Sequence, residues 1–202
     1  SGKTKVLVSK AAYLIQEKKV KPGNILAITF TNKAANEMRE RMEKMTDLSS
    51  RNMWIGTFHN ICVRVLRRES QYCAFDSNFV IYDDHDQQVL LKKCLHELAF
   101  DDKKYNPKAV GANISKAKNL LLTPYLYFSE ATNEWEENIG KIYELYQKYL
   151  VNNNAVDFDD LIMITVKMFQ SHPEVLKEYQ NRFHYILVDE YQDTNMSQYT
   201  LI

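Results

Sequence analysis

The sequence predicts an α/β fold, a P-loop parallel sheet that is interrupted by an all-helical insertion. Apolar strand-like runs alternate with helical patterns towards both ends of the chain, which is typical of a parallel sheet. Between about residue 83 and residue 150, helical patterns follow one another with no convincing strand between them. The chain also opens on half of a phosphate-binding loop and carries an acidic pair after its last predicted strand.

The composition indicates a globular protein. Its 202 residues are 45% apolar and 12% aromatic, and they include only 5 Gly and 4 Pro, which argues against low-complexity or collagen-like sequence. No apolar run reaches the roughly 20 residues of a spanning helix, and no basic-then-apolar leader opens the chain. We therefore expect a soluble, cytoplasmic protein without a membrane partner. Cys62, Cys73 and Cys94 lack C-x-x-C spacing, so we expect reduced thiols and no zinc site.

The charges are unevenly distributed although the net charge is zero. Residues 1–72 hold 14 Lys+Arg against 6 Asp+Glu, whereas residues 73–202 hold 12 against 20. A basic first third suits a polyanionic partner such as nucleic acid. Solvated helix faces that differ in sign are the alternative explanation.

The predicted α/β part begins with a helix over residues 5–19, in which Val6, Ala11, Leu14 and Ile15 share one apolar side. Pro22-Gly23 ends this helix, and the run at 25–30 is predicted to be a strand buried on both faces. The pattern continues with a helix at 32–45 and a strand at 53–58.

The second half returns to the same alternation after the helical block. Helices are predicted at 84–99, 107–121 and 133–150, then at 157–169 and from Pro173, and a strand is predicted at 184–190. We therefore assign residues 1–75 and 155–202 to one α/β domain and residues 76–154 to the insertion. Asp157 is predicted to be the N-cap of its helix, with no catalytic role.

The first four residues, Ser1, Gly2, Lys3 and Thr4, match the second half of the motif G-x-x-x-x-G-K-[ST]. In this motif the glycine lets backbone N–H groups approach phosphate oxygens. The lysine lies by the β and γ phosphates, and the hydroxyl binds Mg²⁺ at a helix N-terminus. The match predicts nucleotide binding at this end of the chain.

Asp189 and Glu190 lie at the end of the predicted strand at 184–190. In a parallel sheet ligands bind beyond the carboxyl ends of the strands, so this pair is predicted to face the phosphate loop. Asp189 would hold Mg²⁺, and Glu190 would position and deprotonate the attacking water. An exposed acidic turn after a core strand is the alternative.

Five strings occur in the order and spacing of the N-terminal motifs of superfamily 1 helicases: SGKT, ILAITFTNKAANEM, IGTFHNICVRVLR, VDFDDL and ILVDEYQDTN. Together they cover nearly the whole chain, which resembles the UvrD/Rep family. The resemblance implies a RecA-like 1A domain interrupted by a helical 1B subdomain, and ATP-dependent 3′ to 5′ movement on single-stranded DNA in repair or replication. It implies ATP and Mg²⁺ as cofactors. The implied partners are single-stranded DNA, single-strand/duplex junctions and repair or replication proteins.

The resemblance implies DNA contacts from residues that follow two of the strands: Phe30, Thr31, Asn32, Thr57, Phe58 and His59. An aromatic ring after a strand can stack on a base while hydroxyl and amide groups bind phosphate. Phe30 as the last core residue of its strand is the alternative. Gln192, in the extended acidic motif, is expected near the γ-phosphate or as a relay to DNA.

The chain also departs from the family pattern. It begins inside the phosphate loop, and Lys5 stands where relatives commonly carry an arginine that flanks the base, so we expect weakened nucleotide binding. It stops just after the acidic motif, and without a second RecA-like domain we expect negligible ATP hydrolysis from this fragment alone. A non-catalytic DNA- or protein-binding module is the rival function. A small-molecule P-loop kinase is a third, which the strings TFTNKAANEM and DEYQDTN do not support.

Overall fold

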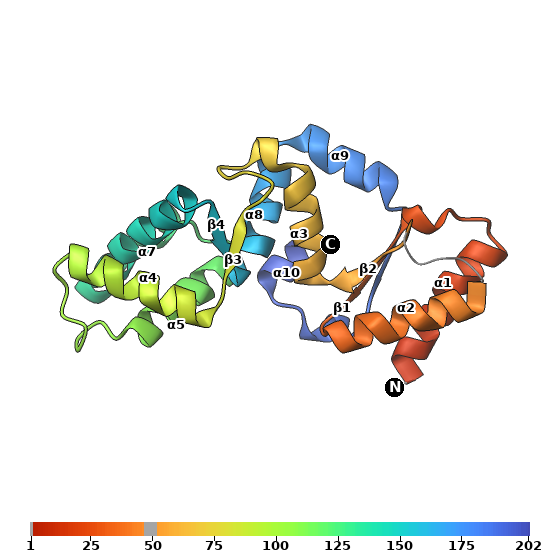
Figure 1. Ribbon diagram of the computed structural model, residues 1–202, viewed down its shortest axis with the longest axis horizontal. Helices are drawn as coiled ribbons and strands as arrows, with labels where there is room; N and C mark the ends of the chain where they lie inside the picture. Colours follow the sequence, from red (N-terminus) through yellow and green to blue (C-terminus); the bar gives the residue numbers. More distant parts are fainter. Residues whose placement is uncertain (1, 47–51) are drawn as a thin grey trace. The chain divides into compact units, whose positions relative to one another are not determined.

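The computed structural model describes residues 2–46 and 52–202, and the chain divides into two compact units (Figure 1). Unit 1 comprises the described residues up to Arg64, Phe169–Thr194 and Ile202, and unit 2 comprises Val65–Met168 and Asn195–Leu201. These boundaries differ from the domain boundaries that the sequence predicts, after residues 75 and 154. The assignment of a 1A domain and a 1B insertion stays a prediction.

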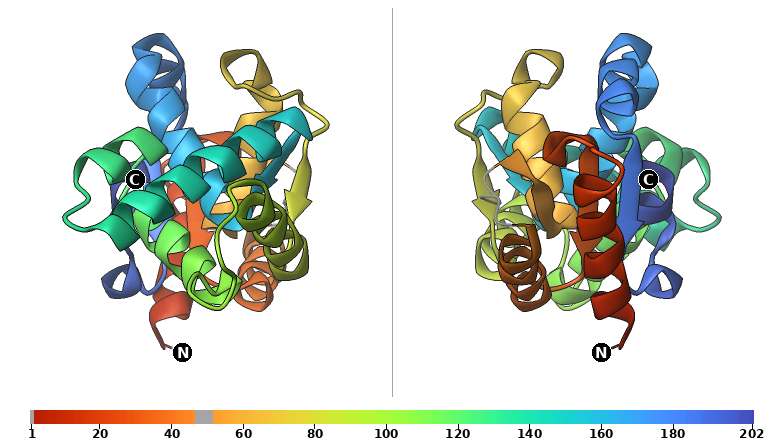
Figure 2. Two further views of the ribbon diagram at one scale, coloured as in Figure 1. Left: turned by 90° about the vertical axis from the view of Figure 1, so that its left-hand side faces the viewer. Right: turned by 90° about the vertical axis from the view of Figure 1, so that its right-hand side faces the viewer.

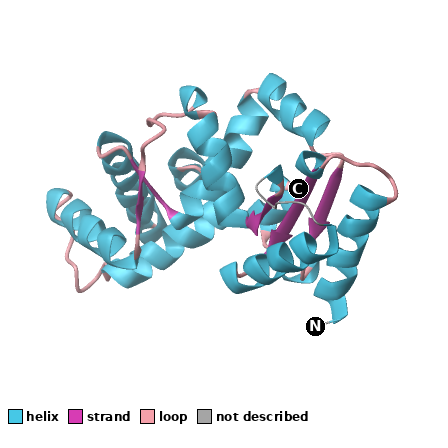
Figure 3. Cartoon of the chain, turned by 45° about the vertical axis from the view of Figure 1, so that its right-hand side comes forward, coloured by secondary structure: helices cyan, strands magenta, loops and turns pink. Residues whose placement is uncertain are grey.

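Unit 1 contains a three-stranded parallel sheet in the order β2-β1-β5 (Figure 3). Its strands are β1 (Ile25–Thr29), β2 (Trp54–Thr57) and β5 (Tyr185–Val188), and its helices are α1 (Gly2–Gln16), α2 (Asn32–Thr46) and α9 (Pro173–Arg182), with short 3-10 turns at Pro22–Asn24 and Tyr191–Asp193. Helix α3 (Phe58–Arg68) crosses the boundary between the units. The predicted α/β class with parallel strands is confirmed.

Helices α1 and α2 pack against each other, and their apolar sides share one core with the sheet (Figure 1). Ala11, Leu14 and Ile15 are buried there, as their helical spacing predicts. Val6 was expected on the same side but is 67% exposed; Val8, two positions later, is buried instead. The right panel of Figure 2 shows α1 running from the N-terminus along this part of the molecule.

The middle strand β1 is buried along its whole length, whereas β5 is not. The successive side chains of β1 are all buried, so both faces are covered, as predicted, and a hydrogen-bonded strand on each side covers both edges. β5 pairs with β1 alone among the strands of the described chain, and Tyr185 and Ile186 are 37% and 42% exposed. Its apolar sequence therefore predicted a strand but did not predict that the strand lies at an edge.

Unit 2 is mostly helical and has its own apolar core. Its helices are α4 (Asp84–Glu97), α5 (Pro107–Asn119), α6 (Pro124–Ser129), α7 (Glu134–Asn152) and α10 (Met196–Leu201), with a 3-10 turn at Ser70–Tyr72. Helix α8 (Phe158–Ser171) also begins in unit 2 and crosses the boundary after Met168. The expected helical block is confirmed for α4, α5 and α7, and the short helix α6 was not predicted. Two further strands, β3 (Val80–Tyr82) and β4 (Ala155–Asp157), pair in parallel. They stand directly before and after the helical block in the sequence. Each has three residues, which is too short for a periodic pattern.

Three features expected from composition can be compared with the structure. Cys62, Cys73 and Cys94 are reduced thiols in the described chain, as predicted. Within the described residues, no helix has the length and apolar character needed to cross a membrane. In the same residues, no group of three or more His, Cys, Asp or Glu side chains could hold a metal ion.

Candidate nucleotide and DNA site

The carboxyl ends of the three parallel strands of unit 1 lie at one edge of the sheet. Thr29 at the end of β1 is in register with Thr57 at the end of β2, and Ile28 is in register with Val188 at the end of β5. The residues after each strand therefore emerge side by side. The sequence predicted functional residues after all three strands, and the topology brings those positions to a common edge.

Helix α1 brings the half phosphate loop to the same edge. The Lys3 ammonium lies 3.0 Å from Glu190 Oε2, and the Thr4 hydroxyl donates a hydrogen bond of 2.7 Å to Asp189 Oδ2. Thr4 and Asp189 are buried, whereas Lys3 and Glu190 are open to solvent. Residues from opposite ends of the sequence are thus neighbours, as the two-ended nucleotide site requires.

The exposed pair stays ionised over a wide pH range. The hydrogen bond and charge of Glu190 raise the pKa of Lys3 above its ordinary value. The hydrogen bond from Lys3, then the one from Gln192, hold the pKa of Glu190 below its ordinary value. Because both groups are solvated, this pair contributes little to stability and can separate when a more highly charged ligand arrives.

The acidic segment after β5 has an unusual backbone. Glu190 adopts the left-handed conformation, with φ 51° and ψ 40°, which a residue with a side chain rarely adopts. The 3-10 turn Tyr191–Asp193 follows at once. The Gln192 amide donates to Glu190 Oε2 at 2.5 Å and to Asp193 Oδ2 at 3.3 Å. Gln192 therefore contacts the carboxylate of Glu190 directly.

The remaining residues predicted for the nucleotide have simpler surroundings. Ser1 lies outside the described residues. Gly2 begins α1, and a Cβ atom built there meets no atom within 4 Å. Lys5 is exposed on the same helix. Thr4 and Asp189 together offer a hydroxyl and a carboxylate, the hard oxygen ligands that Mg²⁺ prefers when phosphate and water complete its shell.

One predicted DNA contact is at odds with the structure. Phe58 is 1% exposed, and its ring packs against that of Phe30 edge to face, with centroids 5.6 Å apart. A ring buried to this degree cannot stack on a base, so the contact expected of Phe58 is wrong. Phe30 is half-buried, and the buried Phe58 ring packs against it.

The polar residues after the two strands fall into two groups. The hydroxyls of Thr31 and Thr57 accept hydrogen bonds from backbone N–H groups three residues later, at 3.1 and 3.2 Å, so they cap α2 and α3. Thr57 is also buried. Asn32 is exposed, and its side-chain oxygen accepts a hydrogen bond of 2.9 Å from Asn60. His59 is half-buried beside them in sequence.

A model of the UvrD/REP helicase N-terminal domain matches residues 1–202 of the chain. The protein belongs to this family. The ATP-dependent DNA helicases PcrA of Staphylococcus aureus (strain Mu50 / ATCC 700699) and of Bacillus subtilis (strain 168) are each 48% identical to it over 202 residues. The PcrA helicase of Leuconostoc citreum is 46% identical over 203 residues. The whole chain is covered, but it spans only 28%, 27% and 27% of these relatives.

This UvrD/REP helicase N-terminal domain also contains a buried charge cluster in unit 2 that the sequence did not predict. It consists of Lys118, Asp157, Asp160 and Tyr146. Asp157 does cap α8, as predicted, because its side chain accepts from the Asp160 N–H at 2.9 Å. The sequence did contain a signal for the lysine. Lys118 lies four positions after the buried Ile114, on the apolar side of α5.

The aromatic residues of the helical block divide between core and surface. Five such residues are Tyr105, Tyr125, Tyr127, Phe128 and Trp135. Tyr105 is in the core of unit 2, and Tyr127 and Trp135 pack against it. Tyr125 and Phe128, on α6, are 78% and 45% exposed.

Proposed function

We propose that this chain is the part of an ATP-dependent DNA helicase that holds MgATP and contacts single-stranded DNA. The observation that carries the proposal is the pairing of Lys3 with Glu190 and of Thr4 with Asp189 at the edge of one parallel sheet. A phosphate loop and an acidic pair at the same edge are the two halves of a site for phosphoryl transfer. The named relatives are ATP-dependent DNA helicases, which supports ATP as the nucleotide.

In the proposed mechanism, the γ-phosphate of ATP replaces Glu190 as the partner of Lys3. Thr4 and Asp189 would hold Mg²⁺, which would neutralise charge that develops on the phosphates. Once released from Lys3, Glu190 orients and deprotonates the attacking water. Gln192, which already donates to Glu190, keeps that carboxylate directed at the water or senses the γ-phosphate.

DNA is proposed to bind at the ends of β1 and β2. Phe30 stacks on a base, and Thr31, Asn32 and His59 contact the backbone of the strand. Thr57 and Phe58 support this surface from within the fold. The whole protein would couple ATP hydrolysis to 3′ to 5′ movement and duplex unwinding in repair or replication.

Two titrations at fixed salt test the proposal, one with a fluorescent ATP analogue and Mg²⁺ and one with a labelled single-stranded oligonucleotide. Losing a charge-assisted contact to phosphate costs enough to predict a weakening of about 10- to 100-fold for the analogue in Lys3→Ala. The matched control is Lys10→Ala, an exposed lysine on the same helix, which should bind as the wild type does. DNA binding that survives Lys3→Ala, together with no nucleotide binding by the wild type, would favour a DNA- or protein-binding module instead.

A further inference from the structure

The acidic segment Asp189–Thr194 is held at its start by the sheet. The Asp189 N–H donates to the Ile28 carbonyl at 2.9 Å, which continues the pairing of β5 with β1. At its other end the segment is joined by a peptide bond to Asn195. How firmly Asn195 is held therefore decides how firmly the end of the segment is held.

Asn195 is fixed as the N-cap of α10. Its side-chain oxygen accepts from the N–H of Gln198 and from the hydroxyl of Ser197, each at 2.9 Å. Its own N–H donates to the Gln198 side chain at 3.1 Å, which completes a reciprocal cap. The cap uses the oxygen of the Asn195 amide and leaves its Nδ2 group to donate elsewhere.

That Nδ2 group donates to Asn119, the last residue of α5. The distance from Asn195 Nδ2 to Asn119 Oδ1 is 2.5 Å. Asn119 in turn donates through its own Nδ2 to Asp159 Oδ1 at 3.0 Å and to the Ser115 carbonyl at 2.9 Å. Both ends of the Asn119 amide are thus engaged, and its orientation is determined by three partners.

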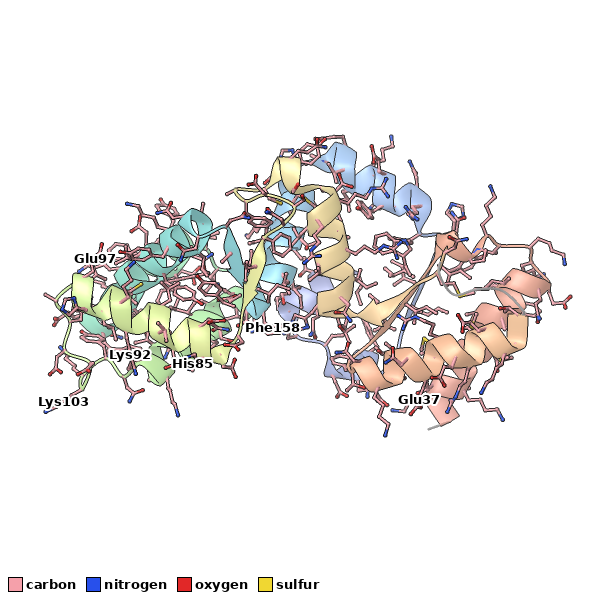
Figure 4. The ribbon with its side chains drawn as sticks, viewed as in Figure 1. Glu37, His85, Lys92, Glu97, Lys103 and Phe158 are labelled. Atoms are coloured by element: carbon pink, nitrogen blue, oxygen red, sulfur yellow. The ribbon has the colours of Figure 1, made fainter. Side chains whose placement is uncertain are left out.

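The neighbouring residue, Lys118, fixes the position of α5. It has no exposed side-chain surface, and its ammonium lies 2.6 Å from Asp157 Oδ2 and 2.8 Å from Asp160 Oδ1. Tyr146 and Gln147, both on α7, donate to the same two carboxylates at 3.0 and 3.1 Å. Figure 4 marks the start of α8, between these two acids, with the label Phe158.

Burying a lysine and two carboxylates is costly, and well-packed apolar residues often stabilise a protein as much. The cluster instead gives the last turn of α5 a defined geometry. The next residue of that turn, Asn119, binds Asn195, and Asn195 directly follows the acidic segment. The links in this series are the ion pairs of Lys118, the hydrogen bond between Asn119 and Asn195, and the peptide bonds that join neighbouring residues.

We propose that Asn119 is a positioning residue for the acidic segment Asp189–Thr194. Through Asn195 it restrains the chain on which Glu190 and Gln192 are placed, while Lys118 fixes Asn119. Asn119 itself touches no reacting group. The inference rests on the proposed nucleotide site, because a position for Glu190 has consequences only if that residue acts on nucleotide.

Two variants remove the same hydrogen bond from opposite sides. Asn119→Leu keeps the approximate volume but loses the acceptor, together with the bonds that Asn119 donates to Asp159 and Ser115. Asn195→Ser keeps an effective N-cap and loses the Nδ2 donor. Asn113→Ala is the matched control, since Asn113 lies on the same helix and donates only to the carbonyl of Ala109 among the bonds described. If Asn119→Leu fails to fold, Asn195→Ser still decides the question.

The first readout is amide hydrogen exchange of Asp193 and Thr194, whose N–H groups bond to Glu190 and Tyr191 within the segment. Loss of one hydrogen bond predicts faster exchange by about three- to tenfold in either variant, with no change in the control. The double variant should exchange no faster than the singles, because all three lack the same bond. Additive effects, or unchanged exchange in both single variants, would overturn the proposal.

The second readout is affinity for the fluorescent ATP analogue with Mg²⁺. Asn195→Ser should weaken binding by about three- to tenfold and Asn119→Leu by at least as much, whereas Asn113→Ala should not weaken it. If the wild type binds no nucleotide, the proposed function fails and the exchange experiment still decides the positioning of the segment. Nucleotide binding that is intact and equal in all variants would refute the role of Asn119.

Discussion

Replacement of Lys118 by methionine tests how much unit 2 depends on the cation in its buried charge cluster. Methionine is of similar length and fills the same space, so the main loss is the charge that lies 2.6 and 2.8 Å from two carboxylates. Removing one partner of a buried ion pair costs about 3–5 kcal/mol. A protein of this length loses about 2–4 °C in Tm per kcal/mol, so we expect Lys118→Met to lower Tm by about 6–20 °C.

The assay is thermal unfolding followed by far-UV circular dichroism at pH 8 and at pH 5. The loss should be smaller at the lower pH, because there the uncompensated carboxylates can take up protons. Lys92→Met is the control, since Lys92 is exposed on α4, as its label in Figure 4 shows. The reasoning fails if Lys118→Met unfolds within a degree or two of the control at pH 8.

Three further outcomes follow from the structure. Burial, and then the charge of Asp157, raise the pKa of Asp160 to about 6 in the fold, so the fold binds this proton more tightly than the unfolded chain does. The stabilisation from this proton should therefore be present below about pH 4 and be lost as the pH rises to about 6. Urea unfolding should show this dependence on pH, and Asp160→Asn should abolish it. Gly140→Ala should destabilise α7 by about 1–3 kcal/mol in the same assay, although alanine favours helix, because the new Cβ would lie 3.0 Å from the Phe128 ring and 3.3 Å from its Cα. Burial raises the pKa of Cys73 to about 11, so its alkylation in the folded protein at pH 8 should be slow compared with that of the urea-unfolded chain, as mass spectrometry can measure.

Much of the fold could be predicted from the sequence because its elements have strong local signals. The strand β1 is a continuous apolar run that ends where polar residues begin, and α7 carries apolar residues at helical spacing over five turns. The pairing of Lys3 with Glu190 was also predictable, since parallel strands present their carboxyl ends at one edge. In each case the local sequence pattern favours the same conformation and contacts that the folded structure contains.

The features that were missed depend on contacts between distant segments. Phe58 follows its strand as Phe30 does, and local sequence does not reveal that one ring covers the other. The strands β3 and β4 pair although their first paired residues, Val80 and Ala155, lie 75 positions apart in the sequence. Lys118 looks like a surface residue in composition, and only its spacing from Ile114 indicates burial.

The left-handed backbone of Glu190 affects how its chemistry can be studied. At φ 51° any residue with a Cβ is strained by about 1–2 kcal/mol, while glycine is not and asparagine tolerates the conformation best. Replacement by glycine or asparagine would therefore alter two properties together, the carboxylate and the backbone strain in the turn. Glutamine keeps the side-chain shape and the backbone strain of glutamate and removes only the negative charge. Glu190→Gln is consequently the substitution in which a change in rate reports on the carboxylate alone.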